Sequence, residues 1–209
     1  MSLILLQRFN NLDTNLILSF SKSMKRLFDL ILSLFLSVLF FIPCIIITIF
    51  VKIESKGPAL YWSDRVGIRG VIFKMPKFRT MKVGTPAVAT HLLDNAENHY
   101  TKLGDFLRKT SLDELPQIYS VLTNNMSFVG PRPALFNQYD LMELRTVNGI
   151  DLIKPGITGW AQVNGRDELS IEQKVKFEVE YLENKSFLFD LNILWLTLSR
   201  VLKSDGISH

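Results

Sequence analysis

The sequence predicts a mostly helical α/β protein in which one compact domain is attached to a membrane by its N-terminal part. Three observations lead to this prediction. An apolar block lies near the N-terminus, a hairpin pattern follows it, and later segments have apolar residues at helical spacing. The 209 residues suffice for one medium domain with an appendage. We therefore divide the chain into an N-terminal interfacial segment (1–23), a membrane helix (24–52) and a globular domain (53–209).

Composition and charge exclude several classes of protein. The net charge of +4 is modest and comes without a long basic run, which favours anionic membrane surfaces or phosphate-bearing ligands over nucleic acid. The chain carries no nucleic-acid-binding motif. The only cysteine, Cys44, cannot form an intrachain disulfide, so the domain is compatible with the reducing cytosol. The histidines, His91, His99 and His209, are too scattered for a zinc site.

Two segments near the ends of the chain are candidates for helices at a membrane surface. Residues 1–23 hold two short apolar runs around a polar middle and no small-residue cleavage site. This pattern favours a peripheral helix over a signal peptide. Residues 187–203 carry an apolar stripe that includes Trp195, and they end in cations. This segment is either a core helix or an amphipathic interfacial helix.

The apolar block, residues 30–51, contains 22 uncharged residues in succession. At about 1.5 Å per residue, one helix of this length crosses a hydrocarbon core of about 30 Å. Pro43 divides the block into arms of about 20 Å and about 12 Å, and neither arm crosses alone. A straight span and a re-entrant helix both stay open, and basic residues at both flanks favour the re-entrant form. Asp29, at the mouth of the block, needs a cationic partner such as Arg26 if it is submerged.

The sequence predicts a hairpin directly after the apolar block. Gly67 and Gly70 suggest a turn between two extended pieces. On the second piece Lys77, Arg79 and Met81 share one face, because side chains alternate along a strand. Two aligned cations suit anionic oxygens, although solvated surface charge is the ordinary alternative.

The stretch TSLDELPQ places adjacent carboxylates, Asp113 and Glu114, at a predicted helix start. Ser111 can cap this helix with Glu114 three residues on, or Asp113 can itself be the cap with Pro116 in the first turn. Neighbouring carboxylates raise each other's pKa, whereas a helix N-terminus, a cation such as Arg108 or a bound Mg²⁺ favours the ionised form. This is a setting for a carboxylate nucleophile. The alternative is a capping box without chemistry.

Further candidates for ligand binding lie in the second half of the chain. Arg132 stands between two prolines, so a rigid loop presents it either to a phosphate or as part of a surface turn. Asn164 and Arg166 lie in a glycine-rich stretch that permits close approach of a ligand. Residues 168–183 form a charged amphipathic pattern, which we interpret as a solvated helix face.

Six motifs in this order resemble those of the bacterial sugar transferases known as monotopic phosphoglycosyl transferases. They are KRLFDL, RVG with KFRTM, TSLDELPQ, MSFVGPRP, PGITGWAQVNGR and the terminal helix, and they cover residues 24–207. The chain is similar to the minimal, single-domain form. The resemblance implies transfer of a sugar 1-phosphate from a UDP-sugar to polyprenyl (undecaprenyl) phosphate with release of UMP. It also implies the cytoplasmic face of the inner membrane, and a role in starting lipid-linked glycan assembly.

The resemblance also implies roles for individual residues. Asp113 and Glu114 fall on the catalytic dyad, with Asp113 as nucleophile of a covalent phosphosugar intermediate and as ligand of Mg²⁺. Pro43 becomes the break of a re-entrant membrane helix. The expected partners are a UDP-sugar, a polyprenyl phosphate and membrane lipid, with no nucleic acid, while the oligomeric state stays open and includes a homodimer. The residues expected to bind the substrates are Lys77, Arg79, Arg108, Arg132, Asn164 and Arg166.

The chain departs from the family pattern at several positions outside the dyad. These departures put in doubt which sugar is accepted and how the C-terminal part packs around it. The alternative function is a non-catalytic, membrane-anchored partner of glycan-assembly enzymes that binds nucleotide sugars or lipid, but the intact dyad argues against it. The departures are Ile42 for Ser, Asn124 and Asn125 for Gly-Asp, Ile171 for Trp, and Glu178 and Glu180 for Asp and Tyr.

Overall fold

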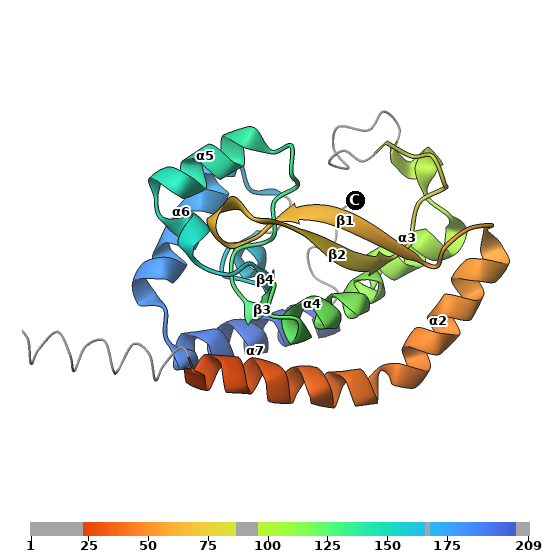
Figure 1. Ribbon diagram of the computed structural model, residues 1–209, viewed down its shortest axis with the longest axis horizontal. Helices are drawn as coiled ribbons and strands as arrows, with labels where there is room; N and C mark the ends of the chain where they lie inside the picture. The colour runs from red at the N-terminus through yellow and green to blue at the C-terminus, as the bar shows by residue number, and fades with distance from the viewer. Residues whose placement is uncertain (1–22, 87–95, 166–167, 204–209) are drawn as a thin grey trace, which may run out of the picture.

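The computed structural model describes residues 23–86, 96–165 and 168–203, and these form a mostly helical α/β fold with two small sheets (Figure 1). The mostly helical α/β part of the predicted fold class is thereby confirmed, whereas the expected interfacial segment lies outside the described residues except for Ser23. After the helix Ser23–Leu39 the elements are α2 (Phe41–Glu54), β1 (Leu60–Val66), η1 (Ile68–Gly70), β2 (Ile72–Phe78), η3 (Ala96–His99), α3 (Lys102–Lys109), η4 (Leu112–Gln117), α4 (Ile118–Leu122), β3 (Ser127–Val129), α5 (Tyr139–Val147), η5 (Ile150–Leu152), β4 (Gly156–Thr158), η6 (Gln162–Asn164), α6 (Ile171–Asn184) and α7 (Phe187–Lys203).

The apolar block folds as two helices, Ser23–Leu39 and α2, which meet at an angle of 59°. Pro43 lies in the first turn of α2, and its ring would clash with the carbonyl of residue 39 in a continuous helix, so the chain bends one turn before the proline. The block is bent near the predicted break, at residue 40 and three residues before Pro43. Within the described ranges no single helix is long and apolar enough to cross a membrane, although the bent pair passes that test together. Its placement in a membrane stays a prediction.

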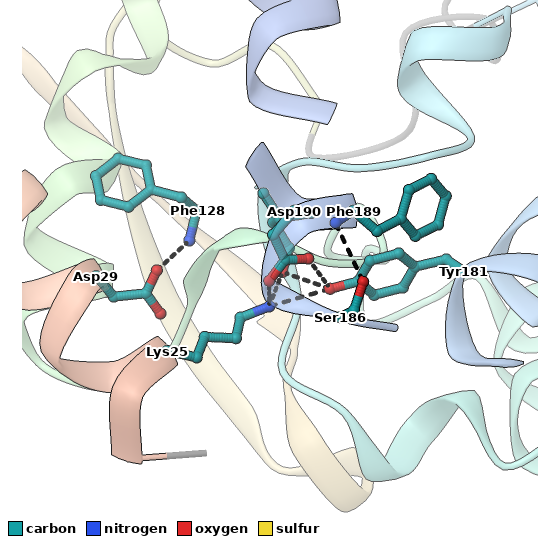
Figure 2. Close-up of polar contacts among 8 residues, drawn as sticks. Lys25, Asp29, Phe128, Tyr181, Ser186, Phe189 and Asp190 are labelled. Atoms are coloured by element: carbon teal, nitrogen blue, oxygen red, sulfur yellow. Dashed lines mark hydrogen bonds and ion pairs between the residues drawn. The ribbon is translucent and has the colours of Figure 1, made fainter. Parts of the chain in front are cut away.

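Asp29 and Arg26, which we named as a possible pair if Asp29 is submerged, have other partners. Asp29 is buried, and its Oδ1 accepts a hydrogen bond from the backbone N–H of Phe128 at 3.3 Å (Figure 2). Arg26 instead donates to the carbonyls of Val121 and Leu122, at 2.7 and 2.9 Å. These carbonyls lie in the last turn of α4, where i to i+4 partners run out; that of Val121 also accepts from the N–H of Asn124 at 3.1 Å.

A second buried cluster joins the start of the helix Ser23–Leu39 to α6 and α7 (Figure 2). Lys25 Nζ lies 2.7 Å from Asp190 Oδ2 and donates to the carbonyl of Val129 at 3.0 Å. The Tyr181 hydroxyl donates to Asp190 Oδ1 at 2.7 Å. Burial and the Asp190 carboxylate raise the pKa of Tyr181, so this hydroxyl stays a donor. The helix Ser23–Leu39 is therefore attached to the domain by a charged cluster as well as by apolar contacts.

The predicted hairpin is confirmed as the antiparallel pair β1 and β2, which runs across the molecule with its turn near α5 and α6 (Figure 1). Beneath it β3 pairs in parallel with β4. A Cβ added to Gly156 would lie 2.1 Å from the backbone nitrogen of Gly130, so glycine permits this close approach. The core around the two sheets is formed by Phe73, Met75, Val121, Met126, Phe128, Val129, Val163, Tyr181 and Ile193.

Helix α7 buries one face and exposes an apolar one. Ile193 is fully buried, whereas Trp195 on the predicted stripe is 67% exposed. The stripe is therefore not the core side of the helix, and an interfacial role for it stays a prediction. In α6 the side chains of Val175, Glu178 and Tyr181 are buried, so this helix is amphipathic but not solvated all round. The exposed apolar residues of α7 are Phe187, Leu188, Leu191, Trp195, Leu198 and Val201.

Candidate active site

The two adjacent carboxylates lie in the short 3-10 helix η4, but neither predicted cap is present. Ser111 precedes η4 with a left-handed backbone (φ 56°) and makes no side-chain capping bond. A capping side chain needs an extended backbone to reach the first N–H groups, and Ser111 instead closes the turn after α3 by donating its N–H to the Arg108 carbonyl. Asp113 lies inside η4 and cannot be its cap. Both carboxylates are therefore available for other uses.

Asp113 is a buried carboxylate without a hydrogen-bonding partner in the described part of the chain. Only 7% of the residue is exposed, and its side chain makes neither a hydrogen bond nor an ion pair among residues 23–86, 96–165 and 168–203. Burial is the main cause that raises the pKa of Asp113 to about 6, with the Glu114 charge adding to it and Lys77 opposing it. Asp113 is therefore ionised above about pH 6 and keeps its lone pairs free.

Glu114 has the opposite environment. Its Oε1 accepts from Lys77 Nζ at 2.7 Å and from Arg132 NH2 at 3.1 Å. Burial alone would raise the pKa of Glu114, but the charges of Lys77 and then Arg132 hold it well below its usual range. Two neighbouring carboxylates thus have pKa values that are pushed apart, an arrangement typical of sites in which they have different roles.

Three of the expected cations meet at the dyad. Lys77 comes from β2, Arg132 from the loop after β3, and Arg108 from the last turn of α3; the charges of all three lower the pKa of Asp113. The Arg108 guanidinium also lies over the ring of Tyr100, with its carbon 4.7 Å from the ring centre. Segments that are far apart in the sequence therefore surround Asp113 with positive charge.

The other expected binding residues lie elsewhere. Arg79 is buried and donates to the carbonyls of Ser55 and Lys56, at 2.8 and 3.3 Å. Strand β2 ends at Phe78, so the alternation that aligned Lys77 with Arg79 ends there, and the unpaired carbonyls after α2 take the guanidinium. Arg79 is therefore not among the cations that contact the dyad, and its expected role in substrate binding stays a prediction. Asn164 donates to the Trp160 carbonyl at 2.7 Å, and Arg166 lies outside the described residues.

Arg65 is a cation of the site that was not predicted from the sequence. It donates from NH1 to the Pro133 carbonyl and from Nε to Ser63 Oγ, each at 3.0 Å. Burial, followed by the charge of Arg132, lowers the pKa of Arg65 to about 10. The register pairs Tyr61 with Lys77, and position 65 shares the face of position 61, so a strand alignment could have found it. A hollow of about 10 Å³ beside the dyad is lined by Arg65, Met75, Lys77, Gln117, Arg132 and Pro133.

A metal ion at this site would depend on the dyad and on its ligand. Among the described residues no three His, Cys, Asp or Glu side chains are grouped to hold a metal. Mg²⁺ is commonly bound by one or two carboxylates, with water and substrate phosphates completing its shell. Asp113 fits this donor set, because both of its oxygens lack partners in the described chain, whereas Glu114 is already engaged by two cations.

Comparisons with known proteins show the family of this chain. Residues 20–204 match the family model described as bacterial sugar transferase. The chain is 40% identical over 186 residues to the uncharacterized sugar transferase EpsL of Bacillus subtilis, covering 89% of this chain and 91% of that protein. It is also 40% identical over 188 residues to the UDP-glucose:undecaprenyl-phosphate glucose-1-phosphate transferase of Escherichia coli, covering 85% of this chain and 40% of that protein.

A further relative is the undecaprenyl-phosphate galactose phosphotransferase of Salmonella typhimurium, which is 34% identical over 221 residues, covering 97% of this chain and 45% of that protein. The chain therefore spans most of the Bacillus protein but less than half the length of the two enterobacterial ones. The family match includes the dyad, the hairpin and the loop of Arg132. This chain belongs to the bacterial sugar transferase family.

Proposed function

We propose that this protein transfers a sugar 1-phosphate from a UDP-sugar to undecaprenyl phosphate and releases UMP. The observation that carries the proposal is Asp113, a buried carboxylate without a partner in the described chain, beside an ionised Glu114 and three cations. A diphosphate brings negative charge to its acceptor carboxylate, so the reaction needs positive charge around both. The substrates follow from the names of the two enterobacterial relatives.

In the first step an oxygen of ionised Asp113 attacks the β-phosphorus of the UDP-sugar. A bond forms between that oxygen and phosphorus, and the bond from phosphorus to the bridging oxygen breaks, so UMP leaves with the electron pair. No proton transfer is required, because the carboxylate is already ionised above about pH 6. Lys77, Arg108 and Arg132 offset the charge that gathers on the phosphoryl oxygens.

In the second step a phosphate oxygen of the lipid attacks the same phosphorus. The bond between phosphorus and Asp113 breaks, which regenerates the carboxylate and leaves a lipid-linked sugar diphosphate. Glu114 stays ionised and keeps Lys77 and Arg132 oriented through both steps. A magnesium ion held by Asp113 and by substrate phosphate oxygens would supply further neutralisation of charge.

We place the bent helix pair in the cytoplasmic face of the inner membrane, as a re-entrant element with both ends on the same side. The 59° bend, the exposed apolar side chains and the basic flanks support this topology. Single cysteines at Ser23 and Lys56, introduced into Cys44→Ser protein, test it with an impermeant label. Labelling of both positions from the same side supports the re-entrant form, and labelling from opposite sides would establish a straight span.

The proposed activity is tested by UMP release from purified protein with Mg²⁺, undecaprenyl phosphate and a panel of UDP-sugars. We expect release that requires the lipid for multiple turnovers and is abolished in Asp113→Asn. Asp105→Asn is the matched control, because this half-exposed aspartate of α3 forms a surface ion pair with Lys109 and, within the described residues, no other. Release in Asp113→Asn at the wild-type rate would remove Asp113 as nucleophile. No release by folded wild-type protein across the panel would favour the non-catalytic partner.

A further inference from the structure

The loop that presents Arg132 is held by its backbone carbonyls. The Val129 carbonyl accepts from Lys25 at 3.0 Å, and the Pro131 carbonyl accepts from the N–H of Gly156 at 2.8 Å. The carbonyl of Arg132 itself accepts from Arg145 NH2 at 2.9 Å. Three different parts of the domain therefore hold the backbone of this loop by hydrogen bonds.

The Arg145 side chain that binds the Arg132 carbonyl belongs to a buried ion pair between α5 and α6. Arg145 Nε donates to Glu178 Oε2 at 2.8 Å, and NH2 donates to Oε1, so the pair is bidentate. Glu178 is only 3% exposed, and Arg145 is buried as well. A bidentate carboxylate fixes the plane of a guanidinium, and NH2 is therefore aimed at the Arg132 carbonyl.

The backbone of Arg132 limits where its side chain can reach. The side chain is 46% exposed, so side-chain packing alone does not fix it. The flanking residues, Pro131 and Pro133, restrict the backbone, and a residue before proline is confined to extended values of ψ. Holding the carbonyl of Arg132 selects one orientation within that range. This orientation sets the direction in which its Cβ leaves the loop, and so the reach of NH2 to Glu114 Oε1 at 3.1 Å.

We propose that the Arg145–Glu178 pair is a positioning device for Arg132: through the Arg132 carbonyl it holds that guanidinium against Glu114 of the dyad. The proposal rests on the proposed function for its catalytic consequence, but not for its geometry. Neither Arg145 nor Glu178 touches the dyad, so both are positioning residues. Arg145 and Glu178 lie far from the loop in the sequence, and they act on the active site through the carbonyl of Arg132.

The test is a double-mutant cycle between Glu178→Gln and Arg132→Gln. We expect each single change to lower kcat/KM for the UDP-sugar about tenfold to a hundredfold, because small misplacements of a binding group cost such factors. In Arg132→Gln protein, Glu178→Gln should cost less than a further twofold, since the group that it positions is already gone. If the losses of kcat/KM in the two single variants multiplied in the double variant, the proposal would be overturned. The Arg145–Glu178 pair would then have only a structural role.

A second readout needs no turnover. In protein with ¹⁵N-labelled arginine, the Nε–Hε resonance of Arg132 is identified by its loss in Arg132→Gln. We expect this resonance to shift or broaden in Glu178→Gln, and an unchanged resonance would overturn the positioning role. Wild-type protein that releases no UMP would count against the proposed function alone, because the spectroscopic comparison still decides the geometry.

Two further variants guard against loss of folding. Glu178→Asp keeps the buried charge and shortens its reach by one methylene, so its kcat/KM should lie between those of wild type and Glu178→Gln, with the same failure to multiply. Thr197→Val is the control for general destabilisation, since it removes a 2.7 Å hydroxyl pair with Thr158 but no charge. Its losses should multiply with those of Arg132→Gln. If the loss of kcat/KM in Glu178→Asp multiplied with that in Arg132→Gln, the proposal would be contradicted even if Glu178→Gln does not fold.

Discussion

Two buried clusters of charge in this protein satisfy their carboxylates to different degrees. In the cluster of Figure 2, Asp190 is bound by Lys25 at one oxygen and by the Tyr181 hydroxyl at the other. At the dyad, Glu114 takes two cations, but Asp113 has no partner in the described chain. Fully paired buried charges are typical of structural clusters. A buried carboxylate that is left open costs stability, and this cost marks it as functional.

The largest expected effect comes from neutralising the open carboxylate. Asp113→Asn should lower UMP release by about a thousandfold or more, because the nucleophile is lost. The same change should stabilise the protein by on the order of 2 kcal/mol at pH 7, since the raised pKa of Asp113 means that burying its charge opposes folding. The rate of UMP release checks the expected loss of activity, and the denaturation midpoint checks the expected gain in stability. Asp105→Asn is the control for both. A loss of stability would show that Asp113 is a paired, structural group.

Asp190→Asn should reverse this pattern. Removing one charge of a buried ion pair leaves Lys25 without its counter-ion, which costs about 3 kcal/mol. Denaturant unfolding measures this loss, and UMP release per folded molecule should fall far less than in Asp113→Asn. Tyr181→Phe provides a smaller step of about 1 kcal/mol, because it removes one hydrogen bond but no charge. If Asp190→Asn abolished turnover in folded protein, the distinction between the two clusters would fail.

The pH dependence separates the two carboxylates of the dyad. Because the pKa of Asp113 is raised to about 6, the fraction able to attack falls about tenfold between pH 7 and pH 5, while Glu114 stays ionised. Stability moves the other way: the contribution of Asp113 is present below about pH 4 and is lost as the pH rises through about 6. Single-turnover UMP release without lipid acceptor checks the rate, because no lipid phosphate then titrates. A flat profile from pH 5 to 7 would contradict the raised pKa.

Local sequence patterns predicted the parts of this fold that neighbouring residues determine. The hairpin follows from alternation and its glycines, and the bend follows from Pro43, whose ring excludes a continuous helix. Asp113 and Glu114 are adjacent in the chain, so their proximity required no knowledge of the fold. Arg132 lies in a loop stiffened by two prolines, and the structure places it against Glu114. For the hairpin, the bend and the dyad the deciding constraint lies within a few residues, whereas the contact of Arg132 with Glu114 depends on the tertiary fold.

The sequence could not predict which partner a long charged side chain reaches. Lys77 and Arg79 are alike in the sequence, but one binds Glu114 and the other the end of α2. Arg26 binds carbonyls of α4 rather than Asp29. Glu178 looked like part of a solvated face, although it stands three residues from both Val175 and Tyr181, which are buried on the same side of α6. Unpaired backbone carbonyls compete for cations, and only the tertiary fold shows where they lie.

The smallest expected effect concerns Arg65, which lies between the two kinds of environment. Its NH1 and Nε make structural hydrogen bonds to Pro133 and Ser63, whereas its charge lies beside Arg132 and Glu114. Arg65→Lys keeps the charge but cannot make both bonds, so we expect KM for the UDP-sugar to rise about threefold to tenfold with kcat little changed. Steady-state kinetics check this, with Arg69→Lys in the hairpin turn as control. An equal effect of both variants would place Arg65 among the structural cations. A rise of KM in Arg65→Lys alone would place Arg65 with the dyad. It would show that the second N–H group of the guanidinium helps to bind the UDP-sugar equally in the ground state and the transition state.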